Sequence, residues 1–167
     1  MRNNKGITLI ALSITIIVII ILSAITINYG TNAIKKSQLE NLKTNMLLIK
    51  AKAKEAVEQA NFKSGPENQY KNDDGSLKEE IASELKGTLE NSVPDYVTLE
   101  EGQYLYSVNS ELDEMGLKNI NIDESKNEKF LVRYDIPKAK VEIYNTVGYK
   151  DNGQTKHSLT ELEGIDY

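Results

Sequence analysis

The sequence predicts an α+β protein in which one long N-terminal helix packs against a small antiparallel β-sheet head. Three observations lead to this fold class: an uncharged apolar run over residues 7–27, a helical apolar period over residues 34–62, and strand-like alternation after Pro94. The 167 residues leave about 100 for the head, which is enough for a small core. Cysteine is absent, so disulfides and thiolate metal sites are excluded.

The first element is the run from Ile7 to Ile27, which contains no charge, Pro or Gly and in which ten of 21 residues are Ile. As a helix rising about 1.5 Å per residue it would be roughly 31 Å long, which matches a bilayer core of about 30 Å. Because lipid gives a strand no partners for its backbone, even this β-branched run should coil. We therefore predict that residues 7–27 are the transmembrane half of the helix.

Small residues fall broadly on one side of this helix and form a stripe where another helix could approach closely: Thr8, Ala11, Thr15, Ser23 and Thr26. Three interpretations of the run are open. The first is a secretory signal peptide with a cleavage site at Leu22-Ser23-Ala24. The second is a plain membrane anchor, and the third is an anchor that is processed at its start. A signal peptide fits less well, because the apolar run continues past Ala24 and a helical pattern follows directly.

The junction Lys5-Gly6-Ile7-Thr8-Leu9-Ile10 resembles the cleavage and methylation site of type IV pilins and of the pseudopilins of type II secretion and competence systems. In that family a short basic leader ends in Gly, and an aliphatic or aromatic residue, Thr, Leu, and Ile or Val follow. The resemblance implies that residues 1–6 are a cytoplasmic leader, with its charge on Arg2 and Lys5. Cleavage would fall between Gly6 and Ile7, and the amine of Ile7 would be methylated.

Ala11 is the main departure from the family pattern, because most members carry Glu at this fifth mature position. In the family that Glu is thought to pair with a neighbour's mature amine, and a buried carboxylate in lipid is costly unless it is paired. Ala avoids this cost but gives up the charge that would set register. The absence of this charge favours a minor, initiating or tip subunit. The Ile-Thr-Leu-Ile-Ala form is also similar to variants found in Gram-positive bacteria.

Residues 28–62 are predicted to be the amphipathic half of the same helix. Their apolar residues recur at spacings of three and four: Leu39, Leu42, Met46, Ile49, Ala53, Ala56 and Ala60. This face suits packing on the protein's own head better than a coiled-coil dimer, because three of its later positions are only Ala. Ser64-Gly65-Pro66 is expected to end the helix.

The head, residues 63–167, should begin with turns and short helices. Asn72-Asp73-Asp74-Gly75 fails the EF-hand calcium pattern, since Tyr70 and Ile81 stand where acids are needed, so a turn is expected there. Two further capping patterns predict short helices or helical turns: Ser76 with Glu79, to about Lys86, and Ser110 with Asp113, ending at Gly116.

Three later segments alternate as half-buried strands do: residues 103–108, 129–134 and 139–144. In the first of them Tyr104, Tyr106 and Val108 share a face. Asp135-Ile-Pro-Lys138 is the expected turn between the last two strands. Residues 148–167 form a polar tail, in which Ser158 to Glu161 either cap one more helical turn or remain loop.

The net charge of −5 conceals a division between the two parts of the chain. Residues 1–66 carry 9 Lys and Arg against 3 Asp and Glu, whereas residues 67–167 carry 11 against 22. The simpler interpretation is a solubilising surface on each part. The alternative is that acidic heads neutralise the basic stems of neighbouring subunits in a filament.

Residues for catalysis are sparse. His157, the only histidine, lies in the polar tail and is predicted to be a surface residue. The acid pairs Glu79/Glu80 and Glu100/Glu101 are adjacent in sequence, so their side chains should point apart. We expect no enzymatic activity, metal or cofactor, and the acidic head argues against nucleic acid as a ligand.

The resemblance implies a structural subunit, pilin or pseudopilin, of a type IV pilus, type II secretion or competence-like filament. Its expected partners are other such subunits, a prepilin peptidase, membrane lipid and an assembly platform. It would be a single-pass membrane protein with a cytoplasmic N-terminus and an extracellular head, exposed at the cell surface when assembled. The alternative is a membrane-anchored extracellular binding or sensor domain, with a peptidoglycan-modifying enzyme as a more distant candidate.

Overall fold

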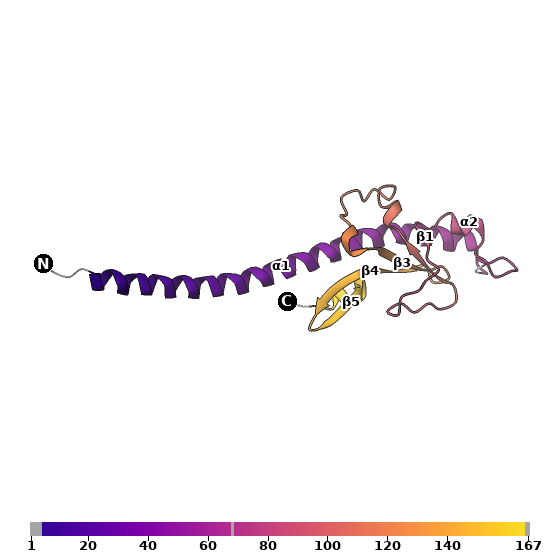
Figure 1. Cartoon of the computed structure of the whole chain (residues 1–167). Helices are drawn as coiled ribbons and strands as arrows, with labels where there is room; N and C mark the ends of the chain where they lie inside the picture. Colours follow the sequence, from indigo (N-terminus) through magenta and orange to yellow (C-terminus); the bar gives the residue numbers. More distant parts are fainter. Residues whose placement is uncertain (1–4, 68, 166–167) are drawn as a thin grey trace. The chain divides into compact units, whose positions relative to one another are not determined.

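The predicted fold class is confirmed in its main features by a computed structural model, which describes residues 5–67 and 69–165. The chain is α+β and combines the 60-residue helix α1 (Lys5–Ser64) with a five-stranded antiparallel sheet (Figure 1). Within α1, side chains are described at residue 12, residues 14–20 and residues 32–64. Two compact units are present, Met1–Glu40 and Asn41–Tyr167, so the second contains the last part of α1.

A membrane-spanning half of α1 was predicted at residues 7–27. Most of the side chains of that segment lie outside the described residues. Over the part of the chain that is described, no helix combines the length and the apolar character that crossing a membrane requires.

The last part of α1 buries the predicted apolar face. Leu39, the first of the seven predicted positions, is buried and belongs to the first unit. In the second unit Leu42 is half-buried and the other five positions are buried: Met46, Ile49, Ala53, Ala56 and Ala60. The helix ends where predicted, because Gly65 adopts φ +71° and its N–H donates to the carbonyl of Phe62 at 3.2 Å. A left-handed residue directly after a helix is the usual way to stop it, and Gly adopts this conformation without strain.

The sheet is a meander in which each strand pairs antiparallel with the next: β1 (Thr88–Leu89), β2 (Gln103–Ser107), β3 (Phe130–Asp135), β4 (Lys140–Asp151) and β5 (Gln154–Ser158). All three predicted strands are present as β2, β3 and the start of β4. The register places Tyr106 opposite Val132, and Val132 opposite Ile143. These three side chains therefore lie on one face of the sheet, and all are buried.

This buried face and the stripe of α1 form the core of residues 41–167. The side-chain amide of Asn61 on α1 donates to the carbonyl of Ile136, at 2.8 Å, in the turn that joins β3 to β4. Tyr134 is fully buried on β3 and packs edge-to-face on Tyr106, with ring centroids 5.5 Å apart. Its hydroxyl donates to the carbonyl of Lys86 at 3.0 Å, so the phenol satisfies its polar end inside the core.

The opposite face of the sheet is also covered, which the half-buried strand pattern did not predict. Leu105, Leu131 and Tyr144 form a second buried cluster with Val97, and Leu99 packs against it. Val97 and Leu99 belong to the segment between β1 and β2, which crosses this face. The sheet therefore contributes to two apolar layers.

Two of the predicted caps are wrong. The turn at Asn72–Gly75 forms as predicted, and the hydroxyl of Ser76, directly after it, donates to the carboxylate of Asp74. Helix α2 (Glu79–Ala82) therefore starts without a side-chain cap, and it ends before Lys86. The hydroxyl of Ser110 donates to Glu111 at 2.8 Å and does not cap a helix. A 3₁₀ helix, η1 (Asn109–Glu111), and turns that end at Gly116 (φ +76°) occupy the predicted place. A second 3₁₀ helix, η2 (Glu124–Lys126), precedes β3.

The polar tail predicted at residues 148–167 is instead largely ordered structure. Strands β4 and β5 form a hairpin, and its two-residue turn is Asn152-Gly153, with φ +48° and +82°. Positive φ at both central residues is typical of a type I′ turn, for which Asn-Gly is the preferred sequence. The capping box at Ser158 and Glu161 is confirmed and starts α3 (Leu159–Glu163).

We predict that Gly153→Ala lowers the free energy of unfolding by about 1 kcal/mol, because a Cβ is strained at positive φ. Gly164→Ala is the matched control. Gly164 has φ −80°, and an added Cβ would meet only an ordinary 3.5 Å contact with the carbonyl of Glu161. Urea unfolding of the full chain in mild detergent, followed by tyrosine fluorescence, measures both. Equal effects of the two substitutions would contradict the assignment of the turn.

Candidate functional site

The candidate assembly segment is the N-terminal part of α1. Every large apolar side chain described there is exposed, between 46 % and 63 %: Leu12, Ile14, Ile16, Ile17, Val18, Ile19 and Ile20. Residues 14–20 make nearly two turns, so they point in all directions around the helix axis. A helix that is apolar on every side is suited to an apolar environment that surrounds it.

Thr15 is the one residue of the predicted packing stripe whose side chain is described. Its hydroxyl donates to the carbonyl of Leu12 at 2.8 Å, so the helix itself satisfies this polar group. Arg2 lies outside the described residues. The other predicted site residues lie on the α1 backbone, but their side chains are outside the described part: Lys5, Gly6, Ile7, Thr8, Ala11, Ser23 and Thr26.

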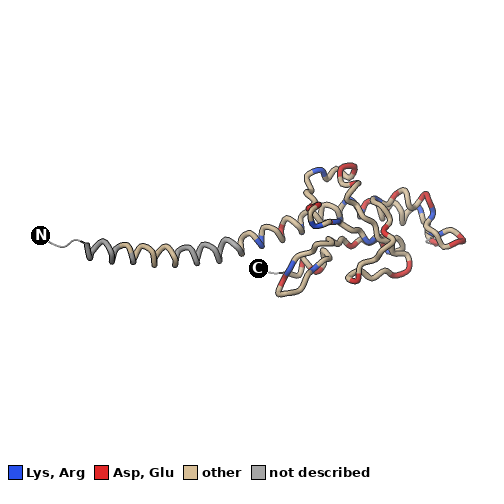
Figure 2. The backbone as a smooth tube through the Cα atoms, in the orientation of Figure 1, with Lys and Arg blue, Asp and Glu red and all other residues tan. Residues whose placement is uncertain are grey.

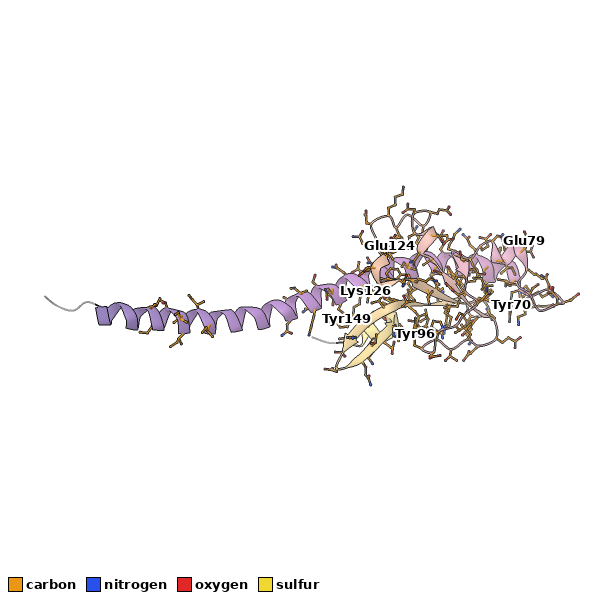
Figure 3. All side chains as sticks on the ribbon, in the orientation of Figure 1. Tyr70, Glu79, Tyr96, Glu124, Lys126 and Tyr149 are labelled. Carbon is orange, nitrogen blue, oxygen red and sulfur yellow. The ribbon has the colours of Figure 1, made fainter. Side chains whose placement is uncertain are left out.

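His157, predicted to be a surface residue, is partly exposed and makes contacts that were not predicted. Its ring is half-buried and stacks on Tyr96, with centroids 3.9 Å apart and planes 7° from parallel; Figure 3 labels Tyr96. Its Nδ1 lies 2.9 Å from the carbonyl oxygen of Asn145. Because a carbonyl only accepts, Nδ1 donates in this contact. The ring thus holds β5, β4 and the segment between β1 and β2 together, a role that no local pattern around residue 157 indicates.

Asn145 is the buried polar residue at the centre of this region. Its amide donates to a Glu128 carboxylate oxygen at 2.8 Å, and its own side-chain oxygen accepts from the N–H groups of Val147 and Gly148. Those two residues lie in the bulge where the β4–β5 register shifts. Gly148 is required there, because a Cβ would come within 2.6 Å of the carbonyl oxygen of Lys156. The network is structural, since each polar group in it has a partner inside the fold.

The adjacent carboxylates of Glu100 and Glu101 are engaged separately, as expected. Glu100 pairs with Lys138 at 3.2 Å, and Glu101 pairs with Lys71 at 3.1 Å. Burial by itself raises the pKa of Asp135, but hydrogen bonds from Gln103 and Lys138 outweigh it and the pKa is lowered. Within the described residues, no three His, Cys, Asp or Glu side chains are grouped so that they could hold a metal ion.

Comparisons of the chain with protein-family models, with curated proteins and with solved structures found no match.

We predict that Glu161 makes the stability of the head depend on pH. Hydrogen bonds from the N–H groups of Ser158 and His157 lower the pKa of its carboxyl. A lowered folded-state pKa adds stability above the ordinary value of 4.5, and this stability is lost as the pH falls through the lowered value. Glu161→Gln should therefore destabilise the protein at pH 7 and do so by less in acid; because Glu161 is exposed to solvent, the effect should stay below about 1 kcal/mol.

Urea unfolding of the full chain at a series of pH values measures this difference. Glu163→Gln is the control, because it removes a carboxylate from the same short helix but leaves the capping box intact. A difference between wild type and Glu161→Gln that stays constant down to pH 3 would contradict the assignment.

Proposed function

We propose that this chain is a structural subunit of the pilin or pseudopilin type, belonging to a type IV pilus, type II secretion or competence-like filament. The observation that carries the proposal is the sequence Lys5-Gly6-Ile7-Thr8-Leu9-Ile10 at the start of a helix of 60 residues. The helix supports the proposal further, because the apolar side chains described on residues 12–20 are exposed. Contact of so many apolar side chains with water is unfavourable, so this segment is suited to an apolar environment.

Assembly would transfer the apolar segment of α1 from one dry environment to another. In the precursor it lies in lipid, and after removal of residues 1–6 it packs among the same segments of neighbouring subunits. Little apolar area meets water in either state, so the step needs no large hydrophobic driving force. Close packing is favoured by small residues and by hydroxyls that the helix satisfies itself, as Thr15 is.

The proposal places the N-terminus in the cytoplasm and the head, with its sheet, outside the cell. The partners are a prepilin peptidase, other subunits and an assembly platform. Ala11 in place of Glu favours a minor or initiating subunit, because the charge that would set register in a uniform filament is absent. In this proposal the chain acts mechanically, through its assembly, and has no catalytic role.

The mature N-terminus tests the proposal. In cells that hold a prepilin peptidase, mass spectrometry should find a chain that starts at Ile7 with a methylated amine. Gly6→Val should block cleavage and leave the full-length precursor, whereas Gly30→Ala, a glycine change outside the motif, should be processed normally. A wild-type chain that keeps residues 1–6 in such cells would overturn the proposal and favour a membrane-anchored binding or sensor domain.

A further inference from the structure

The turn of the β4–β5 hairpin contains the one Asn-Gly pair of the sequence, Asn152-Gly153. Both residues are exposed, and both have positive φ. In a two-residue hairpin the ladder closes with the flanking pair, here Asp151 and Gln154, so the N–H of Gly153 takes no part in the ladder. The nitrogen of Gly153 is therefore not held by the sheet, and it is the next backbone nitrogen after the side-chain amide of Asn152.

We infer that Asn152 is a self-modification site, which converts to aspartate and isoaspartate with water as the co-reactant. The nitrogen of Gly153 attacks Cγ of Asn152, so that a new C–N bond forms, the Cγ–Nδ2 bond breaks, and ammonia leaves with the proton of that nitrogen. Water then opens the cyclic imide at either carbonyl, and nothing is oxidised or reduced. Opening at Cγ gives aspartate in a normal chain. Opening at the backbone carbonyl gives isoaspartate, in which the chain runs through Cβ and Cγ.

The position of the turn in the sheet makes this reaction accessible. Attack requires Asn152 to rotate out of its turn conformation, so the turn has to open locally. Strand β4 pairs with β3 over residues 140–145, and the end of the hairpin extends past β3 as a two-stranded ribbon. Two strands are only marginally stable by themselves, so opening of this end costs much less than global unfolding. Gly153 has no side chain, and its nitrogen therefore approaches Cγ without steric hindrance.

Asp74-Gly75, the one Asp-Gly pair of the sequence, could cyclise in the same way, but the fold protects it. The N–H of Gly75 donates to the carbonyl of Asn72 at 2.9 Å, so the attacking nitrogen is engaged. Hydrogen bonds from the hydroxyl and the N–H of Ser76 lower the pKa of Asp74. Its carboxyl therefore stays ionised, and a carboxylate resists attack by a nucleophile. The structure thus distinguishes two turns that the sequence alone makes similar.

Isoaspartate at residue 152 would disrupt the hairpin. It inserts a carbon into the backbone of a two-residue turn, so Asp151 and Gln154 can no longer pair as they do now. The ladder of β5 is weakened from this end, and β5 carries His157, whose ring stacks on Tyr96. The added charge matters less, because charged residues of both signs occur throughout residues 41–167 (Figure 2). The modification would therefore distinguish older molecules by a loosened hairpin.

Ageing of the full-length chain in mild detergent at mildly alkaline pH tests the inference. Samples are digested, and mass spectrometry that separates isoaspartate from aspartate measures each asparagine. We expect products at residue 152 to form about tenfold faster than at Asn91, which is also exposed but precedes Ser92. Hydroxylamine should cleave the ageing chain after residue 152, because it attacks the cyclic imide.

Hydrogen exchange tests the consequence for the hairpin. In the aged protein the N–H of Lys156, which pairs with Tyr149 across the ladder, should exchange about tenfold faster than in fresh protein. Fresh Asn152→Asp is the matched control, because it carries the new charge on a normal backbone. It should exchange as the fresh wild type does.

Gly153→Ala separates the chemistry from loss of structure. It strains the turn and favours its opening, but the added methyl group hinders the attack, so modification should be about tenfold slower. An unchanged rate in Gly153→Ala, conversion of Asn91 before Asn152, or aspartate formed without isoaspartate would each overturn the inference. None of these measurements involves the mature N-terminus, so the inference and the proposed function can fail independently.

Discussion

Burial of the apolar stripe of α1 against one face of the sheet is the interaction on which the rest of residues 41–167 depends. The stripe supplies Met46 and Ile49 as its large side chains, and each adds about 2 kcal/mol when it is fully buried. The later positions are Ala53, Ala56 and Ala60, which are buried but contribute little apolar area. The bulk needed there comes from the strands, in Tyr134 and Phe130.

The face of the sheet that was predicted to be buried could be identified from the sequence, but the burial of its other face could not. Alternation in β2 and β3 reports burial on one face, and the face of Tyr106 and Val132 was identified from it correctly. Leu105 and Leu131 were missed as core residues because their burial depends on Val97 and its neighbours crossing the other face. Periodicity within a strand carries no information about a covering segment that is distant in sequence.

Local chemistry explains the remaining differences between prediction and structure. The hydroxyl of Ser76 could cap a helix or form a hydrogen bond with the preceding turn. In the structure it donates to the nearby carboxylate of Asp74. Asn152-Gly153 is a strong hairpin signal, but the polar composition around it is typical of a loop as well as of an exposed hairpin. His157 stacks on Tyr96, which is 61 positions earlier, and only the assembled sheet brings the two rings together. Among the predicted site residues only Thr15 has a described side chain, so the motif at Gly6 remains a prediction.

A single helix thus differs in character along its length, and each part suits a different environment. Every large side chain described on residues 14–20 is apolar and exposed, whereas residues 41–64 bury one apolar stripe and carry charged side chains elsewhere. The core of the head uses only one stripe of the later part. The first part is therefore suited to an apolar environment that surrounds it, and the later part to packing on one side and to water on the other.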